Sequence, residues 1–287
     1  MKKIQTGFLV SYDYEKLKKS IPPVYNDSDE IFLALDRENR TWTGTKFEIN
    51  DDFFAWIDAF DVDKKITIYR DDFYIPELSP IDNDTRERTL LGEKMGIGNW
   101  IVQIDADEFF LDFAKFVETL RMYDHFLDQP EKNKVQFSGF LINIYKYLDN
   151  GLLYVNDATK FMVATNYPNY KRARNTKERV IYVPHYALHE TLSRTEEELV
   201  FKISNWGHKD EINSEFFTKW KSANETNYGQ LKDLFYLDPK IWKSLGYFPS
   251  EDLNQIKGFI KDNPNLKKSK LWIFKKNFGQ WFKHLIK

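Results

Sequence analysis

The sequence of 287 residues contains no cysteine. This absence excludes disulfide bonds, zinc sites built on thiolates and cysteine nucleophiles. A chain without cysteine is compatible with a reducing compartment, and we expect a cytoplasmic protein.

Long apolar runs and a strong net charge are also absent. No segment approaches the roughly 20 apolar residues that a membrane-spanning helix needs. The 42 basic and 44 acidic residues leave a formal net charge of −2, which argues against general nucleic-acid binding. The length fits one large domain, or one domain with an appendage.

Aromatic residues, by contrast, are abundant. The chain has 24 Phe, 16 Tyr and 8 Trp, or 17% of its residues. Such rings supply enough apolar area for a substantial core, and some can serve as platforms for ligand rings or sugars.

The first 110 residues alternate short apolar segments with helical patterns. We expect strands over 3–10, 30–36, 64–70 and 99–105, and helices over 14–20, 51–60 and 84–96. This order is typical of βαβ units and predicts an α/β fold with a mostly parallel, Rossmann-like central sheet and flanking helices. Ligands of such sheets bind at the carboxyl ends of the strands. The polar residues to inspect there include Ser11, Asp13, Asp36, Asp105 and Asp107.

The rest of the chain has a different pattern. We expect a helix over 111–124, strands over 134–145 and 159–165, a mixed strand and basic loop over 170–190, a strand over 199–204 and a helix over 213–228. No linker is evident, so we predict one domain over 1–235, with halves 1–110 and 111–235. A helical, basic amphipathic appendage follows over 236–287.

The last segment combines an apolar stripe with many lysines. Apolar residues recur at helical spacing at positions 271, 274, 278, 281, 282 and 285, accompanied by seven lysines. A helix of this kind can lie on an anionic membrane surface, which would make the protein peripheral on the cytoplasmic face. Alternatively, it is a terminal helix that packs on the domain with a solvated basic face. Both interpretations stay open for residues 265–287.

Asp105 and Asp107 follow the apolar segment "NWIVQI" and lie two residues apart. Side chains at i and i+2 of an extended strand point to the same side. Two such carboxylates can bind a divalent cation and leave positions for phosphate oxygens. The next acid, Glu108, should turn to the other face and pair with a basic side chain.

The stretch "GNWIVQIDADEFF", preceded by "TRERTLLGEKMG", resembles the nucleotide-sugar half of inverting glycosyltransferases of the family 2 type, which have the GT-A fold. "GFLVSYDYEKLKKSI" and "EIFLALDREN" are similar to the first two strands of that family. "ALHETL" and "ISNWGH" resemble its later motifs. The resemblance covers residues 4 to 228 and implies transfer of a sugar, with inversion, from a nucleotide-sugar donor, expected to be a UDP-sugar, to a saccharide or glycolipid acceptor.

The resemblance also implies roles for individual residues. Asp107 and Asp105 would bind Mn²⁺ or Mg²⁺, which holds the donor diphosphate, and His208 would complete this metal or diphosphate site. Glu190 would be the general base that removes the proton of the acceptor hydroxyl. A divalent cation would neutralise the charge that develops on the leaving diphosphate.

The donor-binding residues implied by the resemblance are Ser11, Asp13, Asp36 and one of two arginines, Arg86 or Arg88. Simpler interpretations exist for several of these residues. Asp13 could be the N-cap of the first helix. The two arginines could pair with neighbouring acids on a solvated helix.

Glu190 and the basic stretch 171–174 also have competing interpretations. Glu190 could pair with Arg194 four residues later. The basic stretch 171–174 is either a phosphate clamp or a solvated loop, and we favour the loop.

Two other functions compete with glycosyl transfer. In a haloacid-dehalogenase-like phosphatase, Asp105 would be the nucleophile and Asp107 a general acid. In that family, however, the motif usually lies near the N-terminus and Thr or Val follows it. A non-enzymatic membrane- or carbohydrate-binding module would explain the aromatic residues and the basic tail, but not the carboxylates.

Overall fold

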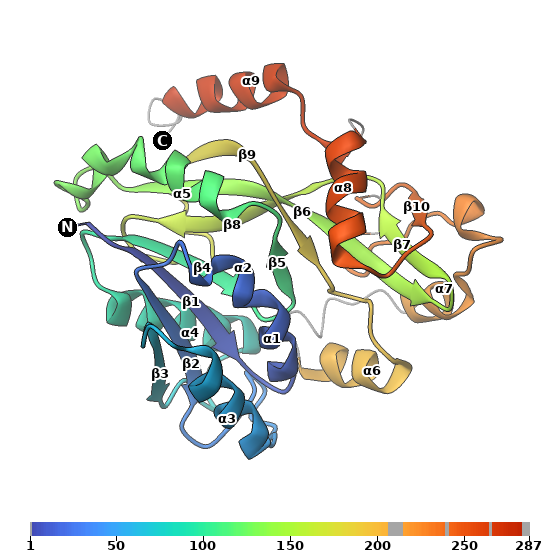
Figure 1. Ribbon diagram of the computed structural model, residues 1–287, viewed down its shortest axis with the longest axis horizontal. Helices are drawn as coiled ribbons and strands as arrows, with labels where there is room; N and C mark the ends of the chain where they lie inside the picture. Colours follow the sequence, from blue (N-terminus) through green and yellow to red (C-terminus); the bar gives the residue numbers. More distant parts are fainter. Residues whose placement is uncertain (1, 206–214, 239–240, 264–265, 283–287) are drawn as a thin grey trace.

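The structure is a computed structural model that describes residues 2–205, 215–238, 241–263 and 266–282 (Figure 1). Its strands are β1 (Ile4–Val10), β2 (Glu30–Asp36), β3 (Ile66–Asp71), β4 (Trp100–Asp105), β5 (Glu108–Phe110), β6 (Val135–Leu148), β7 (Gly151–Val155), β8 (Thr159–Thr165), β9 (Arg179–His189) and β10 (Leu245–Phe248). Its α-helices are α1 (Leu17–Ser20), α2 (Pro22–Tyr25), α3 (Asp51–Phe60), α4 (Pro80–Met95), α5 (Phe113–Arg121), α6 (Glu196–Asn205), α7 (Phe216–Ser222), α8 (Leu253–Asp262) and α9 (Lys270–Trp281).

All of these strands belong to one mixed sheet, in the order β10-β7-β6-β8-β4-β1-β2-β3, with β9 paired to β5 and β6. Parallel pairs join β1 to β2, β2 to β3, β1 to β4 and β6 to β9. The other pairings between described strands are antiparallel. The α/β class is confirmed, but the prediction of a mostly parallel sheet is wrong, because parallel pairing dominates only in the first half of the chain.

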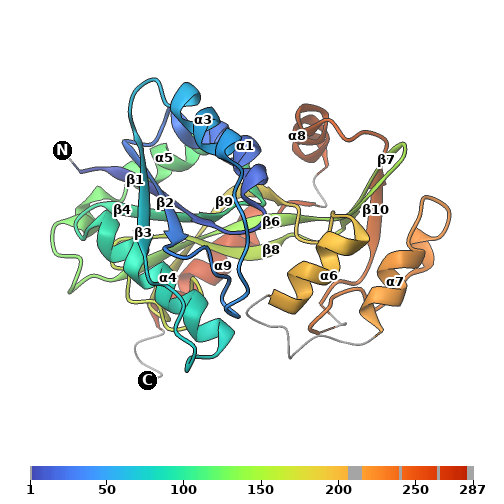
Figure 2. The same ribbon diagram turned by 90° about the horizontal axis from the view of Figure 1, so that it is seen from below.

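The parallel part, β4-β1-β2-β3, has helices on both faces (Figure 2). On one face, Ile31, Leu33 and Leu35 of β2 belong to the same core as Phe53 and Ile57 of α3. On the other face, Phe32 and Ala34 belong to a core shared with α4. This burial on both faces explains the continuous apolar run of β2.

The helix α4 lies close against β1. Gly7 of β1 allows this approach, since a Cβ atom there would lie 2.9 Å from Leu91 Cδ2. The helix begins with Ser79 as N-cap, accepting a hydrogen bond from the Asp82 N–H, and with Pro80 in its first turn. It ends at Met95 and is followed by Gly96 as C-cap, whose φ of 93° is unfavourable for other residues.

The order of the parallel strands creates a position for a ligand. The chain runs outward from β1 to β2 and β3 and then returns to place β4 on the other side of β1. A crevice at the carboxyl ends of neighbouring strands is expected where the order reverses in this way. Here that position lies after Val10 of β1 and Asp105 of β4.

Two predictions for the second half need correction. The segment 199–204 is not a strand but part of α6. The segment 236–287 is not purely helical, because β10 adds to the sheet beside β7 before α8 and α9 follow. Within the described residues, no helix combines the length and apolar character needed to cross a membrane.

Candidate active site

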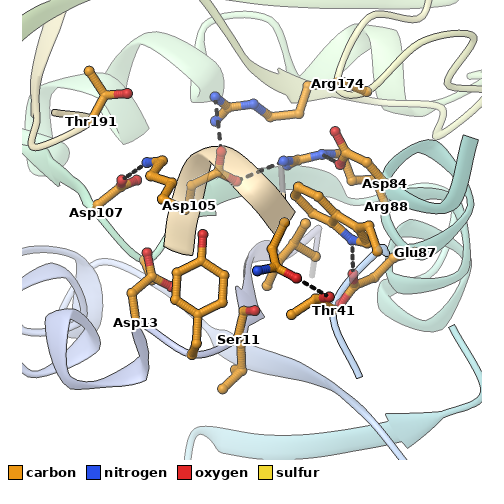
Figure 3. A pocket seen from close by; sticks show the side chains of 18 of the residues that line it. Ser11, Asp13, Thr41, Asp84, Glu87, Arg88, Asp105, Asp107, Arg174 and Thr191 are labelled. Carbon is orange, nitrogen blue, oxygen red and sulfur yellow. Dashed lines mark hydrogen bonds and ion pairs between the residues drawn. The ribbon is translucent and has the colours of Figure 1, made fainter. Parts of the chain in front are cut away.

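A cavity of about 230 Å³ lies at the carboxyl ends of β1 and β4. Figure 3 shows its polar side chains converging from several elements. Among the residues that line it are the predicted Ser11, Asp13, Arg88, Asp105 and Asp107. The structure therefore brings together five of the nine predicted site residues, at the sheet edge where the strand order reverses.

Asp105 is held between two arginines. Arg88 Nη2 donates to Asp105 Oδ1 at 2.9 Å, and Arg174 Nη2 lies 3.6 Å from Oδ2. The side chain of Asp105 is 30% exposed, so one side of it remains open toward the cavity. Although burial opposes ionisation, the charges of Arg174 and Arg88 hold the pKa of Asp105 below its ordinary value.

Both arginines are themselves anchored. Arg88 Nε donates at 2.5 Å to Asp84, which is located one turn earlier on α4. Arg174 donates to both carboxylate oxygens of Glu108 at 2.6 Å, and Glu108 also accepts the backbone N–H of Asp105 at 2.9 Å. The prediction that Glu108 pairs with a basic side chain is confirmed. The favoured interpretation of 171–174 as a solvated loop is wrong for Arg174.

Asp107 is the more buried of the two aspartates, with its side chain 5% exposed. Its Oδ2 accepts hydrogen bonds from Arg194 Nη2 and Lys202 Nζ, each at 2.7 Å. Although burial opposes ionisation, Lys202, His189 and Arg194 hold the pKa of Asp107 well below its ordinary value. Asp105 is the last residue of β4, whereas Asp107 lies in the turn between β4 and β5, and both still line the cavity.

Arg194 links the ends of β1 and β4. The same Nη2 that contacts Asp107 donates to Asp13 Oδ2 at 2.8 Å. Asp13 occupies the N-cap position of the following 3₁₀ helix, η1 (Tyr14–Lys16), as the alternative interpretation had it, but its side chain makes no capping hydrogen bond there and binds Arg194 instead. The suggested pairing of Arg194 with Glu190 is not what the structure shows, since Arg194 binds Asp13 and Asp107.

The helix α6 closes one side of the cavity. Lys202 of this helix binds Asp107, and its last residue, Asn205, accepts hydrogen bonds from Thr41 Oγ1 at 3.3 Å and Thr43 Oγ1 at 2.7 Å. Phe201 contacts the ring of Tyr12 edge-on, with centroids 4.9 Å apart. These contacts hold α6 across the loops that follow β1 and β2.

Glu87 lies deeper in the same cavity, beside Trp42. The indole Nε1 of Trp42 donates to Glu87 Oε2 at 2.6 Å. Burial raises the pKa of Glu87 to about 8, against the opposing effect of this hydrogen bond. The carboxyl group is therefore mainly protonated at neutral pH, which adds a hydrogen-bond donor to the cavity wall.

Glu190, the predicted base, is buried next to the cavity but is not one of its lining residues. Its carboxylate pairs with Lys16 and accepts a hydrogen bond from Tyr147 OH at 2.6 Å. Its backbone N–H donates to the carbonyl oxygen of Asp107 at 2.9 Å. This bond fixes Glu190 beside the Asp-x-Asp turn.

His189 provides an imidazole for the same turn. Its Nε2 lies 3.5 Å from Asp107 Oδ1, and its Nδ1 lies 2.9 Å from Asn143 Oδ1. When Nε2 carries the ring proton, it points that proton at Asp107; when Nδ1 carries it and donates to Asn143, Nε2 is available as a metal ligand. Carboxylate and imidazole groups suit Mn²⁺ and, for the carboxylate, Mg²⁺. The described residues contain no cluster of three or more acidic or histidine side chains positioned to hold a metal ion.

Three predicted site residues occupy other places, and a fourth cannot be placed. Asp36 is buried, and its oxygens accept hydrogen bonds from Arg40 and from the N–H groups of residues 38, 40, 73 and 74. Arg86 donates to the carbonyl oxygen of Asp72. Neither Asp36 nor Arg86 lines the cavity, and Glu190 lies beside it. His208 lies outside the described residues.

Three cations that contact the aspartates were not predicted from the sequence as site residues: Arg174, Arg194 and Lys202. The basic stretch 171–174 and the spacing of Arg194 from Glu190 were visible signals, but each had a simpler local explanation. Lys202 lies within an apolar segment, where a single lysine gives no sign of its partner. All three reach the aspartates from elements that follow Asp107 by 67 to 95 residues in the numbering of the chain.

No protein-family model and no curated protein sequence matches the chain. The crystal structure of S. aureus TarS 1-349 is 9% identical to it, with a TM-score of 0.28, over 52% of this chain and 37% of that chain. The crystal structure of S. aureus TarS is 12% identical, with a TM-score of 0.34, over 79% of this chain and 45% of that chain. The chain thus spans less than half the length of either solved chain.

Proposed function

We propose that the protein is a glycosyltransferase of the GT-A type, which moves a sugar with inversion from a nucleotide-sugar donor to an acceptor hydroxyl. The observation that carries the proposal is the charge pattern of the cavity. Asp105 and Asp107 lie at the switch point of the sheet among four basic side chains, Arg88, Arg174, Arg194 and Lys202. Arginine and lysine at such a position suit a diphosphate.

The nucleoside would occupy the part of the cavity between Ser11, Asp13 and Trp42. Thr41 and the protonated Glu87 offer hydrogen-bonding groups there, and the indole of Trp42 offers an apolar surface. Such a combination of one aromatic group with a few placed polar groups is typical of small-molecule sites. A UDP-sugar is the donor that we propose.

Donor binding would require α6 to move. The cavity of about 230 Å³ is smaller than most ligand sites, which hold roughly 300 to 1,000 Å³. In the structure, Arg194 and Lys202 are engaged with carboxylates, and Asn205 holds the end of α6 against Thr43. A bound diphosphate would replace Asp107 as the partner of Arg194 and Lys202. The cavity would widen as α6 shifts.

Glu190 would act as general base. Lys16 and Tyr147 fix the orientation of its carboxylate, and a saccharide or glycolipid hydroxyl would approach from this side. The carboxylate accepts the hydroxyl proton while the acceptor oxygen forms a bond to the anomeric carbon. The bond from that carbon to the diphosphate oxygen breaks on the opposite face, so the configuration inverts.

A divalent cation, Mn²⁺ or Mg²⁺, belongs to the proposal as well. Asp107 and His189 would hold it, since Asp107 Oδ1 and His189 Nε2 face each other. When bound, such a cation neutralises charge on the leaving diphosphate. Lys202 contacts the other oxygen of Asp107 and would compete with the cation for this carboxylate.

Isothermal titration with UDP, GDP and CMP, each with and without Mn²⁺, tests the donor site. We expect UDP to bind, and to bind more tightly with Mn²⁺. Absence of binding for every nucleotide under both conditions would refute the proposal. If instead the protein hydrolyses a phosphomonoester and Asp105→Asn abolishes this activity, the protein is a phosphatase.

The role of the base is tested separately from donor binding. Glu190→Gln should leave the affinity for UDP unchanged and lower sugar transfer by about 10²–10⁴-fold, the range of general-base effects. Glu225→Gln, at an exposed position, is the matched control and should change neither property. A weaker affinity for UDP in E190Q would place Glu190 in the nucleotide site instead.

A further inference from the structure

The helix α9 exposes a continuous apolar face. This face consists of Leu271, Phe274, Phe278, Trp281 and the adjacent Phe282, with exposed fractions from 45% to 66%. The residues recur at steps of three and four, so they lie along one side of the helix. Contiguous exposed apolar surface of this kind usually marks a binding face.

The opposite side of α9 is fixed to β9. Asn277 accepts the N–H of Tyr182 at 2.7 Å and donates to its carbonyl oxygen at 2.9 Å. Gln280 accepts the N–H of Val180 at 3.2 Å. The ring of Trp272 contacts the rings of Phe140 and Tyr182 edge-on. These bonds occupy backbone groups of β9 and orient the helix so that its apolar side faces outward.

The surroundings of this apolar face are basic. Residues 266–282 contain no acid and five lysines, at positions 267, 268, 270, 275 and 276. Burial lowers the pKa of the nearby Lys160, and the charges of Lys276 and Lys268 lower it further, as expected in a positive region. Asp157 pairs with Lys268 and compensates only one of these charges.

Two hollows adjoin the apolar face. One, of about 470 Å³, lies beside Phe274, Phe278 and Trp281. The other, of about 600 Å³, has Lys132, Lys134 and Lys177 in its lining, together with Glu131 and Glu178.

Arg179 lines both hollows. Its guanidinium lies over the rings of Trp281 and Phe126, at 5.4 and 5.9 Å, and its Nε is buried without a hydrogen-bond partner. Apolar and basic surfaces thus meet at one arginine.

The geometry points to an anionic lipid surface as the partner of this face. The apolar side chains of α9 insert among the upper acyl chains, and the flanking lysines contact acidic headgroups. Arg179 and the lysines of the second hollow bind a headgroup phosphate. Figure 1 shows α9 at the outer edge of the molecule, along the first half of β9. His189, at the other end of β9, lies nine residues beyond Val180, the contact of Gln280, which corresponds to roughly 30 Å of extended strand. The membrane face therefore leaves the candidate active site open.

Liposome flotation of the full chain tests this inference, with vesicles of phosphatidylcholine alone and of an equal mixture with phosphatidylglycerol. We expect flotation only with the mixture, and less of it at high salt. The double variant Phe274→Ser/Phe278→Ser should partition at least about tenfold more weakly, because the insertion of one Phe already contributes about that factor. Val62→Ser is the matched control, since Val62 is an exposed apolar residue in the turn between α3 and β3.

Equal flotation of the wild type and the double variant, or no flotation with either vesicle, would overturn the inference. Sedimentation in the absence of lipid tests the main competing explanation, which is that this face joins two copies of the chain. If the wild type dimerises and F274S/F278S does not, the face joins two copies of the chain and the lipid assignment is wrong. UDP binding measured in parallel should be the same in all three proteins, so failure here is distinguishable from failure of the proposed function.

Discussion

Glu87 should make the stability of the protein depend on pH in an unusual direction. Its side chain is buried on α4, where it accepts the indole hydrogen bond of Trp42. Burial raises its pKa to about 8 from an ordinary value of 4.5. Between these two values the folded chain keeps a proton on Glu87, whereas the unfolded chain releases it.

The sign and size of the effect follow from proton linkage. Because the folded state binds one proton more, its free energy of unfolding falls by about 1.4 kcal/mol for each unit of rising pH. The contribution of Glu87 is therefore complete below pH 4.5 and is lost as the pH rises to about 8. The total is about 4 to 5 kcal/mol, a large fraction of the stability of an ordinary domain.

The substitution Glu87→Gln isolates this contribution. Glutamine keeps the shape of the side chain and an oxygen for Trp42, but it cannot ionise. In urea unfolding, the stability of E87Q relative to the wild type should increase by about 4 kcal/mol between pH 5 and pH 8. Glu77→Gln, at an exposed position, should leave the pH profile unchanged. Parallel profiles for E87Q and the wild type would refute the reasoning.

Three other substitutions test the packing around α4 and α8 by urea unfolding. Arg88→Met leaves two carboxylates without their main partner and should lower the free energy of unfolding by about 3–5 kcal/mol. Part of this loss should return in R88M combined with Asp84→Asn. Gly92→Ala should destabilise by about 1–3 kcal/mol, because the new Cβ would lie 2.4 Å from Pro168 Cβ. Gly258→Ala in α8 meets no atom within 4 Å and should stabilise by about 0.5–1 kcal/mol. Equal effects of the two glycine substitutions would contradict the steric explanation.

The first half of the fold could be predicted because local patterns are sufficient there. The strand over 30–36 is apolar from Ile31 to Leu35, which is what a parallel strand buried on both faces requires. The helix over 51–60 is flanked by Asn50 as N-cap and was predicted with its observed bounds. The boundary at residue 235, by contrast, stays a prediction.

The helix α6 shows why the second half was harder. The segment 199–204 is short and apolar, and periodicity alone does not separate a strand from a buried helix at that length. The decisive signal lies just before it, in a capping box. Thr195 Oγ1 accepts the N–H of Glu198, and the Glu198 carboxylate accepts the N–H of Thr195. The stretch "TEEE" at residues 195–198 is thus a signal for the start of a helix that includes Lys202.

The partners of the two aspartates have a different origin. Asp105 and Asp107 were expected to share a face because of strand alternation, but Asp105 ends β4 and Asp107 lies in the turn that follows. Both nevertheless line the cavity. Arg174 and Lys202 reach them through the folding of distant segments, and no spacing in the sequence encodes those encounters. A buried carboxylate without a partner is strongly destabilising, so each aspartate required a cation somewhere in the chain. The presence of such cations was therefore predictable on physical grounds, whereas their identity depended on the fold. These cations are also the groups proposed to bind the diphosphate. In the free site they are therefore paired with the aspartates, and a bound donor would replace those carboxylates as their partner.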